Sequence, residues 1–219
     1  KMLKIGFPTA LQMFFEVTAF AGAAFICGLV SAKDIASHQI ALSMASFTFN
    51  LCIGFSVAST VLIGRKLGER DFVGLKNVGV NNLKIVFIFM FVCGLFFIIG
   101  RHVLPTFFTK PEDVDVVQLA AKLMIIAALF QLSDGIQVVA LGSLRGIQDV
   151  KIPSIITFIA YWLIAIPLGY VLCVPLNMGA FGMWIALGLG LTVSAFLLVY
   201  RFLSLSQKKI VAFEKQKLV

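Results

Sequence analysis

Hydrophobic residues make up 60% of this 219-residue chain and charged residues only 13%, with a formal net charge of +8. A soluble domain has roughly a quarter charged residues, so a single globule of this length could not bury so much apolar surface. The composition excludes an ordinary soluble domain. Because several apolar runs reach the roughly 20 residues needed to cross a bilayer, it predicts a polytopic membrane protein.

Hydropathy predicts an all-α fold, a bundle of six transmembrane helices. In chain order, the predicted spans are residues 5–30, 36–63, 83–100, 118–142, 153–174 and 180–203. Longer connections are expected at 64–82 and 101–117. Pro167 lies inside the fifth span, where a kink is expected. We expect residues 1–203 to form the six-helix transmembrane domain and residues 204–219 a basic cytoplasmic tail.

Lysine and arginine residues fall mainly on one side of this topology, at both chain ends and in the loops that share their side. The positive-inside rule then places both termini in the cytoplasm, and the expected location is the inner (plasma) membrane. No basic face carries interleaved aromatic residues, so a nucleic-acid partner is not expected. The first apolar run has no signal-peptide cleavage site. The chain opens on Lys1 almost directly with a helix, as a piece of a longer protein would.

Two acidic residues lie within the predicted spans, Glu16 in the first and Asp134 in the fourth. Glu16 is roughly 16 Å into its helix at 1.5 Å per residue. Asp134 is about as far from Lys122, so both lie near the midplane of a core about 30 Å thick. An acid at that depth costs roughly 2.5–3.5 kcal/mol, and such residues are functional by default. The alternative is a protonated, hydrogen-bonded packing role for each acid.

Polar side chains at helical spacing form a stripe on three of the spans. We expect these stripes to face one another or a water-filled cavity, because lipid offers no hydrogen bonds. The expected cavity-lining residues are Gln12, Gln39, Ser46, Asn50, Gln131 and Gln137. For Ser43 and Ser46, packing between helices is an equal alternative. Glu16 and Asp134 would then share a proton or a monovalent metal cation, Na⁺, as the site of ion coupling, with no other cofactor.

The remaining reactive side chains predict no second site. The four cysteines, Cys27, Cys52, Cys93 and Cys173, stand singly in apolar runs, which indicates small buried residues and neither disulfides nor a metal site. His38 and His102 are too far apart in sequence to suggest a shared metal. Arg145 and Asp149 lie at a helix end, where Arg145 is expected to anchor exposed carbonyl groups.

Three stretches carry a family resemblance: "GFPTALQMFFEVTAF" (6–20), "HQIALSMASFTFNLCIGFSVASTVLIGRKLGERD" (38–71) and "FQLSDGIQVVALGSLRGIQDVKIP" (130–153). They resemble the C-terminal lobe of the NorM-like branch of the multidrug and toxic compound extrusion (MATE) family. The resemblance implies helices seven to twelve of a twelve-helix antiporter that exchanges lipophilic cationic drugs for Na⁺ or H⁺. It also implies that Glu16 and Asp134 match the branch's membrane-embedded acids, and that an N-terminal six-helix lobe is a missing partner.

The expected function is therefore half of a cation-coupled multidrug efflux antiporter, without enzymatic activity, with cationic drugs and membrane lipids as partners. A flippase for lipid-linked oligosaccharides is one alternative, but it would need basic residues within the spans, and Lys122 near a rim is the nearest candidate. A membrane enzyme such as a prenyl transferase would need an Asp-rich metal motif. The one acidic run, Glu112 to Asp115, stands beside Lys110 with no partner motif. A passive channel would need no ion gradient.

Overall fold

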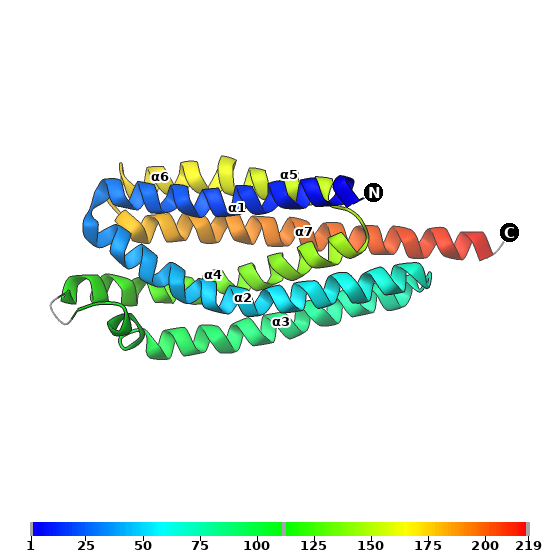
Figure 1. The fold of residues 1–219 in the computed structure, drawn as a ribbon, viewed down its shortest axis with the longest axis horizontal. Helices are drawn as coiled ribbons and strands as arrows, with labels where there is room; N and C mark the ends of the chain where they lie inside the picture. Colours follow the sequence, from blue (N-terminus) through cyan, green and yellow to red (C-terminus); the bar gives the residue numbers. More distant parts are fainter. Residues whose placement is uncertain (1, 111–112, 218–219) are drawn as a thin grey trace.

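The computed structural model describes residues 2–110 and 113–217, which form helices without a β-strand (Figure 1). Its helices are α1 (Met2–Val30), α2 (Ala32–Gly68), α3 (Phe72–Gly100), the 3₁₀ turn η1 (Leu104–Phe107), α4 (Val114–Gly146), α5 (Lys151–Phe158), the π-helical η2 (Ile159–Ala165), α6 (Ile166–Cys173) and α7 (Gly179–Lys217). Because α5, η2 and α6 follow one another without a gap, they form one span. Within the described residues, six helices are then long and apolar enough to cross a membrane, and the all-α prediction is confirmed.

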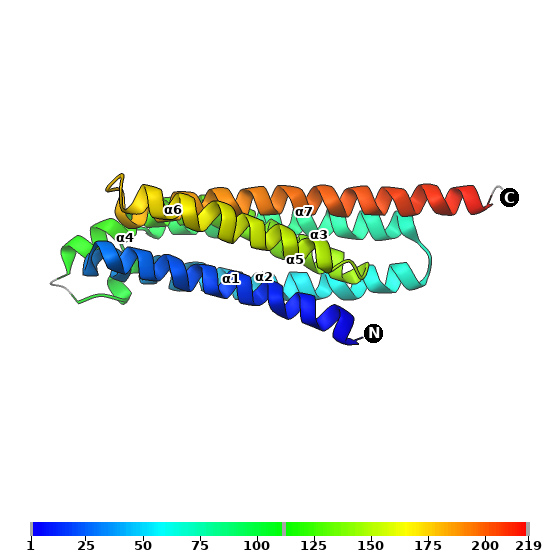
Figure 2. The same cartoon turned by 90° about the horizontal axis from the view of Figure 1, so that it is seen from above.

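The helices run roughly parallel to one long axis (Figures 1 and 2), and in the view of Figure 1 α7 and α4 lie between α1, α5 and α6 on one side and α2 and α3 on the other. Helix α4 packs against α2, α3 and α7, and α7 packs against α6. Helix α1 begins and α7 ends at the same end of the bundle, which we call the terminal end (Figure 1). The Glu69–Asp71 turn and the connection at 147–150 lie there too. The opposite end holds Ser31, η1 and the turn before α7.

The prediction of a long connection at residues 64–82 is wrong, because most of these residues are helical. Helix α2 continues to Gly68 and α3 begins at Phe72, so only a short turn separates them. Asp71 caps α3 by accepting a 2.8 Å hydrogen bond from the N–H of Gly74. Hydropathy detects the apolar part of a helix, whereas the helix itself continues through polar residues until a capping residue ends it.

The last helix, α7, runs unbroken from Gly179 to Lys217, past the predicted span boundary at residue 203. Near its C-terminal end it contacts the start of α3, where the ring of Phe213 lies 5.3 Å from that of Phe72. Residues 204–217 therefore extend a transmembrane helix. A separate cytoplasmic tail stays a prediction, and residues 218–219 lie outside the described residues, as do Lys1 and Glu112.

The irregularity expected at Pro167 takes the form of the π-helical segment η2 directly before it. The N–H of Ile166 donates to the carbonyl of Tyr161, five residues earlier, in place of the usual four. Pro167 has no N–H, and its ring would clash with a carbonyl in a regular α-helix. A π-helical segment relieves that conflict and is common near functional sites.

Helices α2 and α4 approach each other closely in the half of the bundle near the terminal end. A Cβ atom at Gly142 would clash with the backbone oxygen of Ser56, so the absence of a side chain permits this approach. The Ser56 hydroxyl donates to the carbonyl of Val138 at 2.7 Å, and the Thr60 hydroxyl donates to that of Gly142 at 2.9 Å. Small residues and hydroxyl groups of this kind typically join helices in membranes.

Glu69, Asp71 and Asp149 at the terminal end have basic partners. Asp149 accepts two hydrogen bonds from the Arg201 guanidinium, at 2.5 and 3.1 Å, which ties the connection after α4 to α7. Lys66 pairs with Asp71 at 2.8 Å. The hydrogen bond from Lys66, followed by that from the Gly74 N–H, lowers the pKa of the Asp71 carboxyl below its usual value. These pairs anchor the ends of helices.

Candidate cation site

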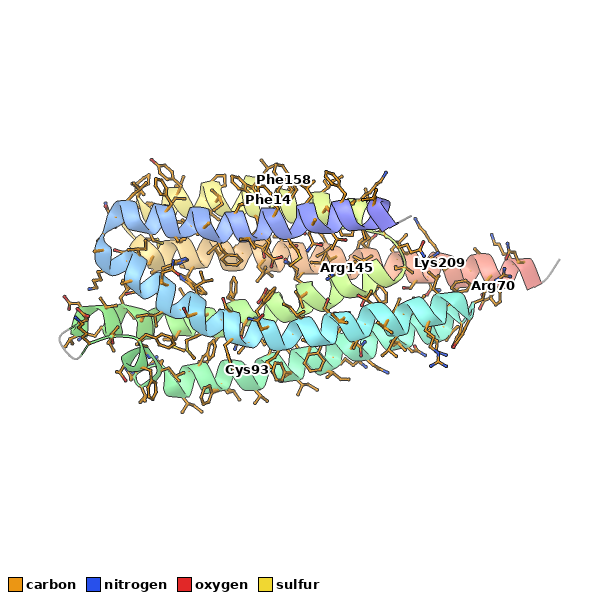
Figure 3. The ribbon with its side chains drawn as sticks, viewed as in Figure 1. Phe14, Arg70, Cys93, Arg145, Phe158 and Lys209 are labelled. Atoms are coloured by element: carbon orange, nitrogen blue, oxygen red, sulfur yellow. The ribbon has the colours of Figure 1, made fainter. Side chains whose placement is uncertain are left out.

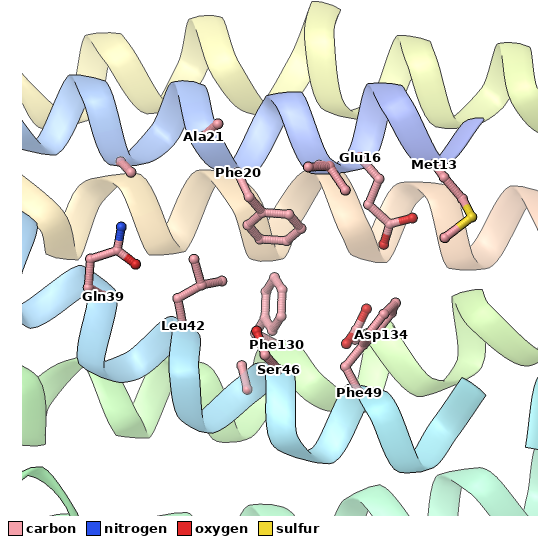
Figure 4. A pocket seen from close by; sticks show the side chains of 13 residues that line it. Met13, Glu16, Phe20, Ala21, Gln39, Leu42, Ser46, Phe49, Phe130 and Asp134 are labelled. Atoms are coloured by element: carbon pink, nitrogen blue, oxygen red, sulfur yellow. The ribbon is translucent and has the colours of Figure 1, made fainter. Parts of the chain in front are cut away.

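Glu16 on α1 and Asp134 on α4 line the same pocket, of about 370 Å³, between α1, α2 and α4. Their carboxyl groups point toward each other across it (Figure 4), and they interact electrostatically. Both side chains are buried, with 8% and 3% of their surface exposed. The pocket is lined by Met13, Glu16, Val17, Phe20, Ala21, Ala24, Gln39, Leu42, Ala45, Ser46, Phe49, Phe130 and Asp134. Two acids distant in sequence are thus brought together.

The pocket wall beside the two acids is mainly apolar and partly aromatic. The rings of Phe20 and Phe130 meet edge to face with centroids 6.0 Å apart (Figure 4). Phe130 packs in turn against the buried Trp184, at 5.3 Å, which fixes its position. An apolar, partly aromatic wall next to two carboxyl groups can accept a compound that is both lipophilic and positively charged.

Tyr161 in η2 contacts Glu16 and is a site residue that sequence reasoning missed. Its buried hydroxyl accepts a 3.2 Å hydrogen bond from Nε2 of Gln137, which leaves the hydroxyl proton free to be donated. The Tyr161 hydroxyl interacts with the Glu16 carboxyl, to which it can donate that proton. Oε1 of Gln137 has no hydrogen-bond partner in the part of the chain that the structure describes. The sequence signal that could have indicated this residue is a tyrosine inside an apolar span, six residues before Pro167.

Arg145, expected to anchor a helix end, also acts electrostatically on Glu16. Its guanidinium donates to the Ser56 hydroxyl at 3.2 Å, which holds it between α2 and α4. Arg145 lines a second, more open hollow of about 630 Å³ toward the terminal end, and Met13 lines both hollows. The expectation that Lys122 is the nearest basic candidate in the spans is therefore wrong, since Arg145 lies in the same span and within electrostatic reach of Glu16.

The other predicted site residues divide into two groups. Gln39 and Ser46 line the pocket. Buried Gln12 lies outside its lining, and exposed Asn50 donates to the carbonyl of Ser46 at 2.8 Å. Gln131 accepts from the Thr48 hydroxyl at 3.1 Å and donates to the carbonyl of Met90 at 3.3 Å, so it joins α4 to α2 and α3.

The directions of the side chains on α4 explain this division. A step of three residues along a helix turns the side chain by about 60° from the starting direction. Gln131 and Gln137 therefore flank Asp134 on opposite sides, and each meets a neighbouring helix instead of the pocket. That Gln131 and Gln137 take part in ion binding stays a prediction.

The two acids offer carboxyl oxygen atoms as ligands to the pocket. Carboxylate oxygens suit a proton or a hard cation, whereas soft metals prefer sulfur. Among residues 2–110 and 113–217, no three His, Cys, Asp or Glu side chains are grouped to hold a metal ion. The pair of Glu16 and Asp134 thus fits a proton or a monovalent cation such as Na⁺, and that assignment stays a prediction.

Among the described residues, six bilayer-length helices, three of which enclose a pocket with two facing acids, define a multi-pass membrane protein of the transporter class. The chain belongs to the MatE family, whose sequence profile matches residues 8–171. The resemblance inferred from the three sequence stretches is thereby confirmed.

Curated relatives match nearly the whole chain. It is 38% identical over 205 residues to the multidrug resistance protein NorM of Photobacterium profundum, a match that covers 92% of this chain and 44% of that protein. It is 38% identical over 218 residues to the multidrug resistance protein MdtK of Yersinia pseudotuberculosis, covering 97% of this chain and 47% of that one. The chain thus spans about half the length of these relatives.

Solved structures share the fold at low sequence identity. The eukaryotic MATE transporter AtDTX14 superposes with a TM-score of 0.86 at 19% identity, over 94% of this chain and 47% of that one. An outward-facing multidrug resistance MATE family transporter gives 0.85 at 18% identity, over 98% and 47%. A MOP superfamily transporter from Pyrococcus furiosus, described as having a binding pocket of reverse polarity, gives 0.80 at 18% identity, over 91% and 43%.

Proposed function

We propose that this chain is one six-helix lobe of a cation-coupled multidrug exporter, in which Glu16 and Asp134 bind the coupling ion, Na⁺ or H⁺. The observation that carries the proposal is the convergence of these two carboxyl groups, from α1 and α4, in one largely apolar pocket. The relatives NorM and MdtK are named as multidrug resistance proteins, which supports drug export. Because the chain spans about half of them, a second lobe would complete the cavity.

Ion coupling follows from the electrostatics of the pair. Two ionised carboxylates facing each other in a poorly solvated pocket repel, and both pay for lost hydration. A bound proton or Na⁺ removes that penalty, so the loaded and empty pockets differ in stability. Loading biases the access of the cavity to one side only if the ion binds the two states with different affinity. A lipophilic drug cation would compete for the same carboxyl groups against the Phe20 and Phe130 rings.

Arg145 and Tyr161 are proposed to support Glu16 in its ionised form. A positive charge and a hydroxyl donor both stabilise a carboxylate, so they would ease release of the ion. Met13, shared by the two hollows, would lie on the path between the pocket and the terminal end.

The membrane orientation is part of the proposal. The basic side chains of Arg70, Arg145 and Lys209 lie toward the terminal end (Figure 3), which the positive-inside rule assigns to the cytoplasm. Fusion of alkaline phosphatase or a fluorescent protein to either chain end tests this. Cytoplasmic termini give fluorescence without phosphatase activity, and the reverse result would overturn the orientation.

The alternatives find less support in the site. A flippase for lipid-linked oligosaccharides needs cations in its pocket for a pyrophosphate, and the lining of this pocket carries two acids and no basic residue. A Mg²⁺-dependent enzyme needs clustered acids, and the candidate run lies at the opposite end of the bundle, where Asp113 and Asp115 are exposed and Glu112 is outside the described residues. We therefore propose that the chain acts in transport and not as an enzyme. A passive channel differs from the proposed exporter in that it would transport without an ion gradient.

The test is the variant Asp134→Asn in the two-lobed protein, with ethidium efflux measured from loaded cells. We expect efflux to fall by about tenfold or more, as loss of an essential charge-stabilising group typically does. The matched control is Asp115→Asn, which changes an exposed acid of the same helix. Undiminished efflux from the Asp134→Asn protein would reject the coupling role.

A further inference from the structure

Two cysteines that stand alone in the sequence meet in the structure, near the end of the bundle opposite the terminal end. Cys27 lies in the last turn of α1, which ends at Val30, and Cys173 is the last residue of α6. Helices α1 and α6 lie side by side there (Figures 1 and 2). The two thiol groups interact with each other within one buried cluster, and both side chains are fully buried. The two residues are therefore neighbours in the folded chain.

The surroundings of this pair favour a neutral group over a charged one. Cys27 and Cys173 belong to an apolar cluster that includes Met183 and Trp184. The carboxylate of Asp34 acts electrostatically on both thiols, and it is held in place by hydrogen bonds of 2.6 Å from the N–H of Ala180 and 2.6 Å from the hydroxyl of Ser31. Burial and a fixed negative charge both oppose thiolates. A disulfide is uncharged and apolar, so neither effect opposes it.

We propose that Cys27 and Cys173 are a redox-modification site, at which an oxidant of the disulfide class converts the two thiols into a disulfide that ties α1 to α6. One cysteine loses its proton to solvent, and its thiolate attacks a sulfur of the oxidant, which releases one thiol and leaves a mixed disulfide. The second cysteine, also deprotonated, attacks the cysteine sulfur of that mixed disulfide and releases the second thiol. The protein loses two electrons and the oxidant gains them.

The reaction requires local opening of the bundle, because the attacking species is a thiolate that the closed structure disfavours. The ends of α1 and α6, which carry the two cysteines, can separate without unfolding of the core, because helix ends open at low free energy. Oxidation should therefore be slow and should trap the closed arrangement. If the proposed function holds, the cross-link also fixes α1 as one wall of the acid pocket.

The remaining two cysteines provide an internal control. Cys52 on α2 and Cys93 on α3 also interact electrostatically, but Cys93 is only partly buried. Cys93 lies on α3, on the other side of the bundle from α1 and α6 (Figure 3). An oxidant that cross-linked cysteines without regard to geometry would join this pair as readily.

The experiment treats membranes that contain the full-length protein with 4,4′-dithiodipyridine and removes the excess. The protein is then denatured, its remaining thiols are blocked with N-ethylmaleimide, and cross-linked peptides are identified by mass spectrometry. We expect a peptide pair joined through Cys27 and Cys173 as the main product, with both residues alkylated in the untreated protein. Recovery of both as alkylated thiols after oxidation, or a Cys52–Cys93 product in equal yield, would overturn the proposal. The wild-type sequence suffices, so no variant needs to fold.

A second measurement follows thermal unfolding of the purified protein before and after oxidation. The cross-link should raise the melting temperature of the wild type and of Cys93→Ser, and it should leave Cys173→Ser unchanged, because a disulfide restricts the unfolded chain. An equal rise in Cys173→Ser would contradict the assignment. Neither readout depends on drug export, so failure of the exporter proposal and failure of this one are distinguishable.

Discussion

In the packed half of the bundle near the terminal end, polar side chains are paired within the protein, whereas in the pocket between α1, α2 and α4 two carboxyl groups face a hollow. Ser56 and Thr60 donate to carbonyl groups of α4, and Asp149 has Arg201. Asp134, although 3% exposed, has no salt bridge among the described residues. The first group holds helices together. The second remains available to a mobile ion.

The largest effect is expected from removing both pocket acids at once, with Glu16→Gln and Asp134→Asn combined. If these groups bind the coupling ion, Na⁺ or acid should raise the melting temperature of the wild type in detergent, because a ligand that binds the folded state stabilises it. The double variant should lose this response and fold at least as stably without the ion. A retained response would place the ion elsewhere in the protein.

The packed half is tested by Gly142→Ala, which forces a methyl group against the backbone of Ser56. Overpacking of this kind typically costs about 1–3 kcal/mol, and we expect a loss of that size in chemical unfolding. The control is Gly188→Ala on α7, where a Cβ would meet nothing within 4 Å. That change should stabilise the helix by up to about 1 kcal/mol. Equal effects at both positions would mean that α2 and α4 are not in close contact.

A paired acid should behave differently from a pocket acid, and Asp149→Asn tests this. The change removes one side of the two-pronged contact with Arg201, and hydrogen bonds to charged groups contribute about 1.5–3 kcal/mol. We expect a loss near the lower limit, because both side chains are partly exposed. Drug efflux per folded molecule should stay at the wild-type level. Abolished efflux at normal protein abundance would remove the distinction between paired and pocket acids.

The smallest effect concerns pH and the turn between α2 and α3. Hydrogen bonds from Lys66 and Gly74 lower the pKa of Asp71, and those from Arg65 and Lys66 lower the pKa of Glu69. A lowered pKa in the folded state stabilises the protein above the unfolded value, near pH 3.9 for Asp and about 4.3 for Glu. That contribution is lost as the pH falls through the folded value.

The melting temperature of the wild type should therefore fall more steeply between neutral and acidic pH than that of Asp71→Asn. Asp115→Asn serves as the control at the opposite end of the bundle. Parallel curves for Asp71→Asn and the wild type would show that the turn contributes nothing.

The sequence by itself determined the membrane class, the six spans, the family and the two intramembrane acids. These follow from local properties, because an apolar run of sufficient length must cross lipid and an acid within it stands out against its neighbours. Hydropathy missed only the polar ends of the helices, such as residues 72–82 at the start of α3.

The tertiary structure alone decided which side chains meet. Helical spacing places Gln131, Asp134 and Gln137 near one face of α4, but only packing turns Asp134 toward Glu16 and the two glutamines toward other helices. Tyr161 and Arg145 reach Glu16, and Cys27 reaches Cys173, across large separations in sequence. A helical pattern fixes the direction of a side chain about its own axis. The partner depends on how separate helices cross, which is a property of the whole bundle.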